Sequence, residues 1–465
     1  MSNQVQALVV GAGISGLATA YALQQAGVST LILESTPRPG GVIQSAEREG
    51  FLLEWGPQSF AGSASLTKLC RDLNILDQRL LADPKAPRYI LIDGKLQNVP
   101  MGPGILASPL LGGGTRGAIL RDIFGKSSAP EPDESIASFI RRKFSPTLLD
   151  RLVGPFVSGI YGGDPEKLSL RAAFPILHEA ESISGSIVRG IFPVMKQRKA
   201  KRGNTPRERP TLQTFQQGND TITRALAKDL GDRLVCNAEV ISVASLDHDP
   251  EPNAPRFRVT ARTPRGPEAI ETERLVLAVP THVAAKLMAP LHPAFDSQLA
   301  SIEYAGICVV SLGYRKADVN HPLNGFGFLV PRSSSLNILG TVWNSSLFPG
   351  RAPEGYALLT SFIGGATNPP ALQKPTDEVV SIVHGELTPL LCLRNQPIFS
   401  SVSVVPRAIP QYNLGHTARL TALEKLRTQF PGLHFAGNYL NGPAVGTCIE
   451  QAFKVADDIR ISFAN

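Results

Sequence analysis

The fold of the chain is decided by the stretch Gln6-Ala7-Leu8-Val9-Val10-Gly11-Ala12-Gly13-Ile14-Ser15-Gly16. Its first half is an apolar run that predicts a buried parallel strand, and a helical pattern of apolar residues follows the glycines as far as Leu23. Between strand and helix, Gly11 permits a tight turn, Gly13 lets the backbone approach a pyrophosphate, and Gly16 allows close packing of helix on strand. The free amides and positive dipole of the helix N-terminus favour phosphate groups. The stretch therefore predicts a Rossmann-like domain that binds a dinucleotide.

An acidic residue stands where such a domain needs one. The run Ser29-Thr30-Leu31-Ile32-Leu33 predicts a second strand, which ends at Glu34. Glu34 lies 34 − 16 = 18 residues after Gly16, close to the spacing at which a carboxylate binds a ribose hydroxyl pair and repels a 2′-phosphate. Strand, helix, second strand and acid together strengthen the prediction of dinucleotide binding.

The loops that follow indicate which dinucleotide is bound. Arg38-Pro39-Gly40-Gly41 comes just after the acid, and Phe51-Leu52-Leu53-Glu54-Trp55-Gly56-Pro57 comes a short way on. NAD enzymes do not need these loops. Paired glycines let a loop lie against the flavin end of an extended FAD, and Arg38 is available to a phosphate. The loops favour FAD, and an ordinary Gly-Pro turn is the alternative.

The far end of the chain supplies another piece of the same site. Leu433-His434-Phe435-Ala436-Gly437-Asn438 comes first, then Gly442-Pro443-Ala444-Val445-Gly446, and then a helical stretch from Thr447 through Ile459. The N-terminus of this helix would place partial positive charge beside the flavin, where it stabilises the electron-rich reduced ring. Both ends of the chain are therefore expected to build one site.

With these segments in place, the chain resembles the protoporphyrinogen oxidase branch of the FAD-dependent amine oxidase superfamily along nearly all of its 465 residues. The glycine motif marks only the superfamily, whereas segments in the middle and near the end of the chain are specific to the branch. They are Pro132-Asp133-Glu134-Ser135, Ser158-Gly159-Ile160-Tyr161-Gly162-Gly163-Asp164, Lys167-Leu168-Ser169, Phe174-Pro175, Gly325-Phe326-Gly327-Phe328-Leu329-Val330-Pro331, Ile409-Pro410-Gln411-Tyr412, Leu414-Gly415-His416 and Gly446-Thr447-Cys448-Ile449-Glu450.

The resemblance implies a reaction and a set of site residues. The reaction is the removal of six electrons from protoporphyrinogen IX to give protoporphyrin IX, the penultimate step of haem or chlorophyll synthesis, with O2 reoxidising non-covalently bound FAD and H2O2 released. The residues expected to contact FAD are Gly11, Ala12, Gly13, Ile14, Ser15, Gly16, Glu34, Arg38, Gly40, Gly41, Val42, Gly56, Pro57, Gln58, Val240, Gly437, Asn438, Pro443, Ala444 and Val445. Those expected to contact the porphyrinogen are Arg88, Gly159, Gly327, Leu329, Val342 and Phe362.

The chemistry of these side chains fits the implied substrate. Arg88 opens a strand that the turn Asp93-Gly94 folds into a hairpin, and an arginine beside an apolar pocket can bind a propionate bidentately. Leu329, Val342 and Phe362 are suited to sandwich a flat macrocycle, and the two glycines are expected to leave room for its thickness. Flavin N5 is expected to accept hydride, so no catalytic side chain and no metal ligand is predicted.

Two departures from the family pattern bear on the cofactor. Asn438 stands where many FAD folds have an aspartate, which weakens a water-mediated phosphate contact without excluding FAD. Gln58 occupies a variable position near the flavin face, so the sequence supports no catalytic role for its side chain.

The predicted fold class is α/β and α+β multidomain. A discontinuous, Rossmann-like FAD-binding domain of the glutathione reductase type takes residues 1–87, 210–281 and 406–465. A substrate domain with a mixed or antiparallel sheet takes 88–99 and 282–405, and 100–209 forms a mostly helical lobe, for which association with a membrane stays open. Within this lobe, Asp133 is expected to cap a helix over 134–140, and in the FAD-binding domain Asn219 is expected to cap a helix that contains Ile222 and Leu226.

Charge and apolar residues leave the partner open. The formal net charge is +7, most of it between Met195 and Pro210. A solvated, mobile loop is the first interpretation of this stretch, a contact with anionic lipid the second and nucleic acid the last, because no aromatic residues alternate with the charges. The apolar segment Gly102 to Phe124 is too interrupted to span a bilayer, and a buried segment and a membrane-surface segment explain it equally well.

The remaining sequence features concern location and assembly. Five scattered cysteines without a C-x-x-C motif favour a reducing interior. The start MSNQVQALVV lacks the features of a signal or transit peptide. A cytoplasmic enzyme is therefore expected, and peripheral contact with the membrane and a homodimer both stay open.

Three rival functions remain at this point. The first is a coproporphyrinogen III oxidase of the same family, which more cationic residues around the pocket would favour. The second is an amine oxidase or carotenoid desaturase on the same scaffold, although Gly442-Pro443-Ala444 shows no aromatic pair that would cage an amine. The third is a flavin-binding protein without turnover.

Overall fold

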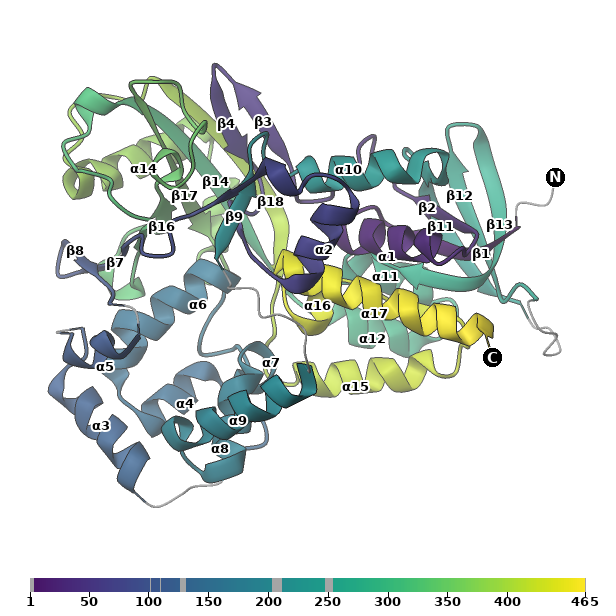
Figure 1. The fold of residues 1–465 in the computed structure, drawn as a ribbon, viewed down its shortest axis with the longest axis horizontal. Coiled ribbons are helices and arrows are strands. Elements are labelled where there is room, and N and C mark those ends of the chain that lie inside the picture. Colours follow the sequence, from purple (N-terminus) through teal and green to yellow (C-terminus); the bar gives the residue numbers. More distant parts are fainter. Residues whose placement is uncertain are drawn as a thin grey trace.

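The computed structural model describes residues 4–100, 102–108, 110–125, 131–202, 211–246 and 254–464. Three parts share these residues: a sheet covered by helices that include α1 (Ile14–Gln25) and α17 (Val445–Ala464), a second large sheet, and a lobe of helices (Figure 1). Multidomain architecture with mixed helix and sheet is thus confirmed. The domain boundaries themselves stay a prediction.

The first sheet has the order β10-β2-β1-β13-β12-β11, with β19 paired to β13. Strands β10, β2, β1, β13 and β19 are parallel, whereas β11 and β12 are antiparallel to their neighbours. The bounds are β1 (Gln4–Val10), β2 (Thr30–Leu33), β10 (Leu234–Val235), β11 (Glu239–Ser245), β12 (Phe257–Thr263), β13 (Gly266–Leu277) and β19 (Leu433–Phe435).

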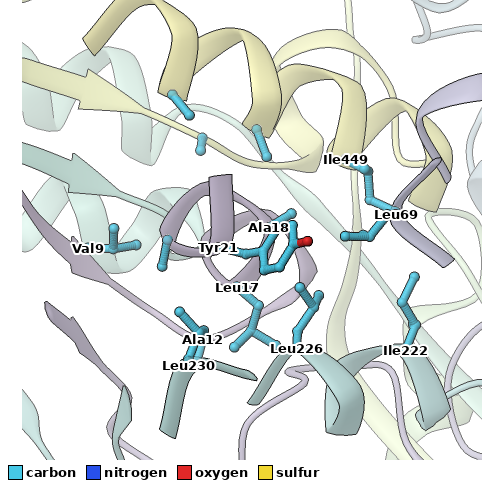
Figure 2. Close-up of a cluster of buried hydrophobic side chains, with 14 of the residues drawn as sticks. Val9, Ala12, Leu17, Ala18, Tyr21, Leu69, Ile222, Leu226, Leu230 and Ile449 are labelled. Carbon is cyan, nitrogen blue, oxygen red and sulfur yellow. The ribbon is translucent and has the colours of Figure 1, made fainter. Parts of the chain in front are cut away.

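Strand β1 is apolar throughout its second half because it is buried on both faces. Ala7 and Val9 face one core with α1, α17 and α10 (Thr221–Leu230), which Figure 2 shows around Leu17. Leu8 and Val10 face a second core, to which four helices contribute. These are α11 (Thr281–Met288), α12 (Pro293–Ala300), α15 (His416–Arg427) and α16 (Asn438–Asn441). The alternation is that of a strand between two helical layers.

The second sheet has the order β18-β14-β17-β16-β15-β7-β8, with β15 and β7 parallel and all other neighbours antiparallel. Its strands are β7 (Arg88–Ile92), β8 (Lys95–Asn98), β14 (Tyr304–Arg315), β15 (Gly327–Leu329), β16 (Ile338–Val342), β17 (Tyr356–Gly364) and β18 (Phe399–Pro410). The predicted hairpin is confirmed: Asp93 and Gly94 have φ of 49° and 76°, as a primed two-residue turn requires. Helix α14 (Thr376–Leu391) packs on one face.

The helical lobe contains α3 (Gly113–Phe124), α4 (Ile136–Lys143), α5 (Pro146–Leu148), α6 (Gly154–Tyr161), α7 (Leu170–Ala173), α8 (Pro175–Ser184) and α9 (Ile187–Arg202). The predicted cap of α4 is wrong by two residues. Ser135 accepts from the Ser138 amide over 3.1 Å, whereas the Asp133 carboxylate accepts from Ser169 Oγ over 2.5 Å and from the Gly415 amide over 2.7 Å. The predicted loop is also wrong for residues 195–202, which continue α9, and 203–210 lie outside the described residues.

Smaller elements connect these parts. They are the hairpin β3 (Ser45–Arg48) and β4 (Phe51–Glu54), the sheet of β5 (Phe60–Ala61), β9 (Leu212–Phe215) and β6 (Arg79–Leu81), and the helices α2 (Ala64–Asp72), α13 (Asn344–Leu347) and α16 (Asn438–Asn441). Within the described ranges, the longest apolar helices still fall short of what crossing a bilayer requires.

Candidate functional site

The glycine turn between β1 and α1 leaves room for a ligand at one position only. A Cβ on Gly16 would lie 1.9 Å from the Gly11 carbonyl oxygen, and one on Gly11, where φ is +97°, would lie 2.8 Å from the Ala278 carbonyl oxygen. Around Gly13, in contrast, a Cβ would have no atom within 4 Å among the described residues, its own chain neighbours and helix backbone aside. Gly13 is also the N-cap of α1 and supplies no side-chain cap. This open position fits the pyrophosphate of FAD.

Glu34 lies beside this turn, as its spacing predicts. The side chain is buried, and its Oε2 accepts from the Ala12 amide over 2.8 Å while Oε1 accepts from the Thr36 amide over 2.9 Å. The start of β11 meets it as well, since the Ala238 amide donates to the Glu34 carbonyl over 2.8 Å. Val240 follows two residues later and is half-buried. The acid and the Val240 strand therefore both lie beside the glycine turn.

The Arg38–Gly41 loop packs directly on the glycine turn. The Gly40 amide donates to the Ala12 carbonyl over 2.8 Å, and a Cβ on Gly41 would lie 3.3 Å from Gly13 Cα. Arg38 donates to the Gly41 carbonyl over 2.9 Å and to the Pro39 carbonyl over 3.2 Å. The guanidinium thus holds its own loop, and its contact with a phosphate stays a prediction.

The Gly56–Gln58 segment packs on the residue after that loop. A Cβ on Gly56 would lie 1.9 Å from the Val42 carbonyl oxygen, so only glycine allows the approach. The expected role of Asn219 as a helix cap is wrong, because Asp220 precedes α10 and makes no side-chain cap. The Asn219 Nδ2 instead donates to the Pro57 carbonyl over 2.7 Å. Asn219 therefore positions the expected flavin-facing turn.

Two aromatic side chains hold the C-terminal part of the site. The Tyr412 hydroxyl donates to the Asn438 carbonyl, and His416 Nε2 donates to the Tyr439 carbonyl over 2.9 Å. The two rings stack with centroids 4.5 Å apart. Burial lowers the pKa of His416 to about 4, so the ring is neutral near pH 7. Gly437 and Asn438 thus begin α16 in a fixed position ahead of the Pro443–Val445 segment.

The predicted substrate residues converge although they are spread over 275 positions, from Arg88 to Phe362 inclusive. Gly327 pairs with Arg88 on one side and Val342 on the other. Val342 and Phe362 belong to one apolar cluster with Phe326, over whose ring the Arg88 guanidinium lies at 5.8 Å. Leu329 packs with the neighbouring cluster of Ile90, Ile92 and Leu110.

The two glycines of this set have another reason than the one expected. A Cβ on Gly159 would lie 2.4 Å from Leu329 Cδ2, which packs α6 against β15. A Cβ on Gly327, where φ is +131°, would lie 2.0 Å from the Thr341 carbonyl oxygen. The space is filled by protein, so the expectation that these glycines leave room for the macrocycle is wrong.

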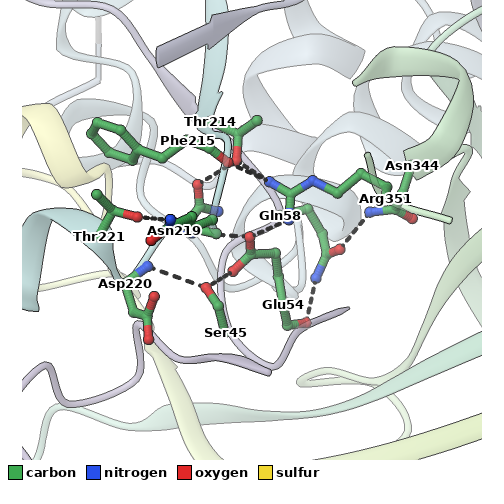
Figure 3. Close-up of polar contacts among 12 residues, drawn as sticks. Ser45, Glu54, Gln58, Thr214, Phe215, Asn219, Asp220, Thr221, Asn344 and Arg351 are labelled. Carbon is green, nitrogen blue, oxygen red and sulfur yellow. Dashed lines mark hydrogen bonds and ion pairs between the residues drawn. The ribbon is translucent and has the colours of Figure 1, made fainter. Parts of the chain in front are cut away.

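A buried polar network behind the site was missed from the sequence. Figure 3 shows it: Arg351 and Glu54, both almost fully buried, form an ion pair of 2.6 Å, and Ser45 Oγ donates to the same carboxylate over 2.5 Å. Burial raises the pKa of Glu54, and the hydrogen bonds from Arg351, Ser45 and the Asn219 amide oppose that rise. The pair joins β4 of the cofactor region to the loop after α13.

Comparison with known proteins agrees with this geometry. The family model described as flavin containing amine oxidoreductase matches residues 14–460. A chloroplastic protoporphyrinogen oxidase of Nicotiana tabacum is 34% identical, over 98% of this chain and 85% of its own length. A coproporphyrinogen III oxidase of Staphylococcus aureus is 27% identical, over 97% of this chain and 98% of its own. A crystal structure from Exiguobacterium sp. 255-15 superimposes with a TM-score of 0.80 at 21% identity, covering 98% of this chain and 99% of its own.

Proposed function

Because the chain belongs to the flavin-containing amine oxidoreductase family, and is an FAD-dependent oxidoreductase, we propose that it oxidises protoporphyrinogen IX to protoporphyrin IX. Six electrons leave the substrate in pairs, and each pair reduces one O2 to H2O2. The observation that carries the proposal is the convergence of Arg88, Val342 and Phe362, from three separate parts of the sequence, on one sheet.

When bound, FAD supplies the ring that accepts hydride and passes electrons to O2. The chain itself positions the cofactor and the substrate and provides the surfaces around them. The open backbone at Gly13 and the Glu34 carboxylate hold the dinucleotide. The Arg88 guanidinium binds a propionate, and Val342 with Phe362 holds the apolar macrocycle and excludes water. The protons released go to solvent or backbone groups.

Protoporphyrinogen is favoured over coproporphyrinogen III because of what surrounds Arg88. The two neighbouring clusters are apolar and contain Phe326, Val342, Phe362, Ile90, Ile92, Leu110 and Leu329 among others. A substrate with four propionates needs more cations than one arginine provides, whereas vinyl groups pack on an apolar surface.

The test is anaerobic mixing of the purified holoenzyme with protoporphyrinogen IX and, separately, with coproporphyrinogen III. Flavin bleaching and porphyrin fluorescence are followed in time. Faster bleaching by protoporphyrinogen supports the proposal, and faster bleaching by coproporphyrinogen transfers the enzyme to the other branch. If neither bleaches the flavin, porphyrinogen oxidation is refuted, and amines or polyenes are tried next.

We also propose that the helical lobe contacts a membrane surface. Phe124 on α3 is 81% exposed and Phe192 on α9 is 70% exposed, and Leu120 and Met195 are exposed on the same two helices. The Asp122 carboxylate joins these helices by accepting from the Val188 amide over 3.0 Å. Lys196 and Lys199, which come just after Met195 within α9, are also exposed. Apolar side chains next to cations fit an anionic lipid surface.

Sedimentation with vesicles tests the membrane proposal. Wild-type protein is expected to bind vesicles that contain anionic lipid and to be released by salt. The variant Phe124→Ser/Phe192→Ser is expected to stay in the supernatant with unchanged flavin content, whereas Leu81→Ser, another exposed apolar residue, serves as the control. Equal sedimentation of all three proteins would refute the contact.

A further inference from the structure

Buried side-chain amides bind the carbonyl oxygens of Glu54, Gly56 and Pro57, in and just before the Gly56–Gln58 turn. Gln58 Nε2 donates to the Glu54 carbonyl over 2.8 Å and to the Gly56 carbonyl over 3.2 Å. The Pro57 carbonyl accepts from Asn219 Nδ2. Both amide protons of Gln58 are therefore used within its own turn, and Oε1 is the polar atom left for another partner.

That partner is Asn344, which follows strand β16 of the second sheet. Asn344 Nδ2 donates to Gln58 Oε1 over 2.8 Å, and Figure 3 shows the two amides end to end beside the Glu54–Arg351 pair. Both side chains are more than nine-tenths buried. Because Gln58 must present Nε2 to two carbonyls, its orientation is fixed, and that in turn fixes the orientation of Asn344.

Asn344 is itself rigidly attached to the second sheet. It comes two residues after Val342 and begins α13. Trp343 between them is fully buried, donates its amide to the Phe326 carbonyl over 3.0 Å and packs its ring against Tyr89 at 5.4 Å. A shift of the strand that carries Val342 is therefore transmitted to Asn344.

The amide of Asn344 is costly to bury. Its Oδ1 has no hydrogen-bond partner within the described part of the chain, and an unpaired buried acceptor destabilises a fold. A leucine has the same branched shape without that cost. What the asparagine offers in exchange is the Nδ2 donor to Gln58.

We propose that Asn344 is a positioning residue that acts through Gln58. It couples the strand that carries Val342 to the Gly56–Pro57 turn, and so fixes the distance between porphyrinogen and flavin. The inference rests on the proposed function for the identity of the substrate. Hydride transfer needs reacting atoms about 3–3.5 Å apart, and a misplacement of about 1 Å lowers the rate by up to about 100-fold.

The test uses near-isosteric variants of the holoenzyme: Asn344→Leu, Gln58→Met and the double variant. In anaerobic single-turnover mixing with protoporphyrinogen IX, Asn344→Leu is expected to bleach its flavin about 10-fold more slowly. FAD content and the porphyrinogen concentration at half-maximal rate are expected to change less than about twofold. The double variant is expected to be no slower than the slower single variant, because both changes remove the same Asn344–Gln58 hydrogen bond.

The matched control is Asn395→Leu, which removes an exposed asparagine bond to Asp318 in the same domain. It is expected to keep the wild-type rate. Equal rates for Asn344→Leu and this control would overturn the coupling, and so would losses that multiply in the double variant.

A measurement without substrate separates this inference from the proposed function. The visible circular dichroism of bound FAD reports the protein around the flavin ring. This signal is expected to differ from wild type in Asn344→Leu and in Gln58→Met, and the double variant is expected to show the same change as the single variants. If wild-type flavin is not bleached by porphyrinogen, the proposed function fails while this signal still tests the coupling. An unchanged signal in Asn344→Leu would overturn it.

Discussion

Two seams join the cofactor region to the rest of the molecule, and they are built in different ways. The sheet seam consists of Glu54 and Gln58 with Asn344 and Arg351, and contains a buried ion pair. The lobe seam consists of Tyr412, which packs in the core of the helical lobe, and His416; both bind the Asn438–Tyr439 backbone through neutral buried contacts. A buried charge that loses its partner is far more costly than a neutral group that loses one hydrogen bond. The sheet seam is therefore the more easily broken by a single substitution.

The largest effect is expected from Arg351→Met. The change leaves the Glu54 carboxylate buried without its cation, which costs about 3–5 kcal/mol of folding free energy. Urea unfolding followed by flavin fluorescence measures it. The double variant Glu54→Gln/Arg351→Met is the control and is expected to recover much of the loss, because no charge remains buried. A single variant as stable as wild type would show that the pair contributes nothing.

The stability loss of Arg351→Met is also expected to depend on pH. Burial already raises the pKa of Glu54, and removal of Arg351 takes away a group that opposes the rise. A carboxyl whose pKa is higher in the folded than in the unfolded state binds protons on folding, so its stability contribution is lost as the pH rises. The deficit of Arg351→Met is thus expected to be smaller at pH 5 than at pH 8. An equal deficit at both would contradict this.

A smaller effect is expected in the lobe seam from His416→Phe. The phenyl ring can keep the stack on Tyr412, but the Tyr439 carbonyl loses its donor, which costs about 1–3 kcal/mol. Burial lowers the pKa of His416 to about 4. A histidine with a lowered pKa contributes stability above its unfolded pKa of about 6.5, and this contribution is lost as the pH falls towards 4.

The advantage of wild type over His416→Phe is therefore expected to be largest at pH 7 and above and to shrink towards pH 4. His178→Phe changes a histidine on α8 of the helical lobe, outside the seam, and serves as the control. An advantage that grows on acidification would contradict a buried neutral imidazole.

Between the seams, the site itself is expected to respond in binding rather than in stability. Arg88→Ala removes a charge-assisted contact to a propionate, and the KM for protoporphyrinogen is expected to rise about 10-fold with kcat and FAD content little changed. Steady-state fluorescence of porphyrin formation measures it, with Lys95→Ala on the adjacent strand as control. An unchanged KM would remove Arg88 from the site.

What could be predicted from the sequence was mostly what local spacing encodes. The strand, glycine turn and helix from Gln6 to Leu23 lie in one continuous stretch, and so does the hairpin around Asp93 and Gly94, because adjacent residues determine these shapes. The six residues expected to contact the porphyrinogen followed from a resemblance; five lie on the second sheet and Gly159 packs against it, and their contact with substrate stays a prediction. The boundaries of the three domains remain predictions.

What could not be predicted depended on contacts across the fold. Glu54 and Arg351 are 297 positions apart, and no spacing links them. Asp133 and Asn219 looked like helix caps because side chains of that type often are, but each instead contacts a segment far away in the sequence. Gly159 was expected to leave room for the macrocycle, and only the structure shows Leu329 packed against it.

The smallest effect is expected from Phe362, which sharpens the comparison by probing shape alone. Its ring is half-buried beside Val342 and Phe326, so Phe362→Ala removes apolar surface from the site without unpairing any polar group. Flat aromatic inhibitors are expected to bind Phe362→Ala a few-fold more weakly than wild type. Phe362→Leu keeps most of the apolar surface, so its affinity is expected to lie between those of wild type and Phe362→Ala. Inhibition curves at fixed porphyrinogen concentration measure the difference. Identical inhibition of wild type and Phe362→Ala would place the macrocycle elsewhere on the sheet and leave Arg88 as its only tested contact.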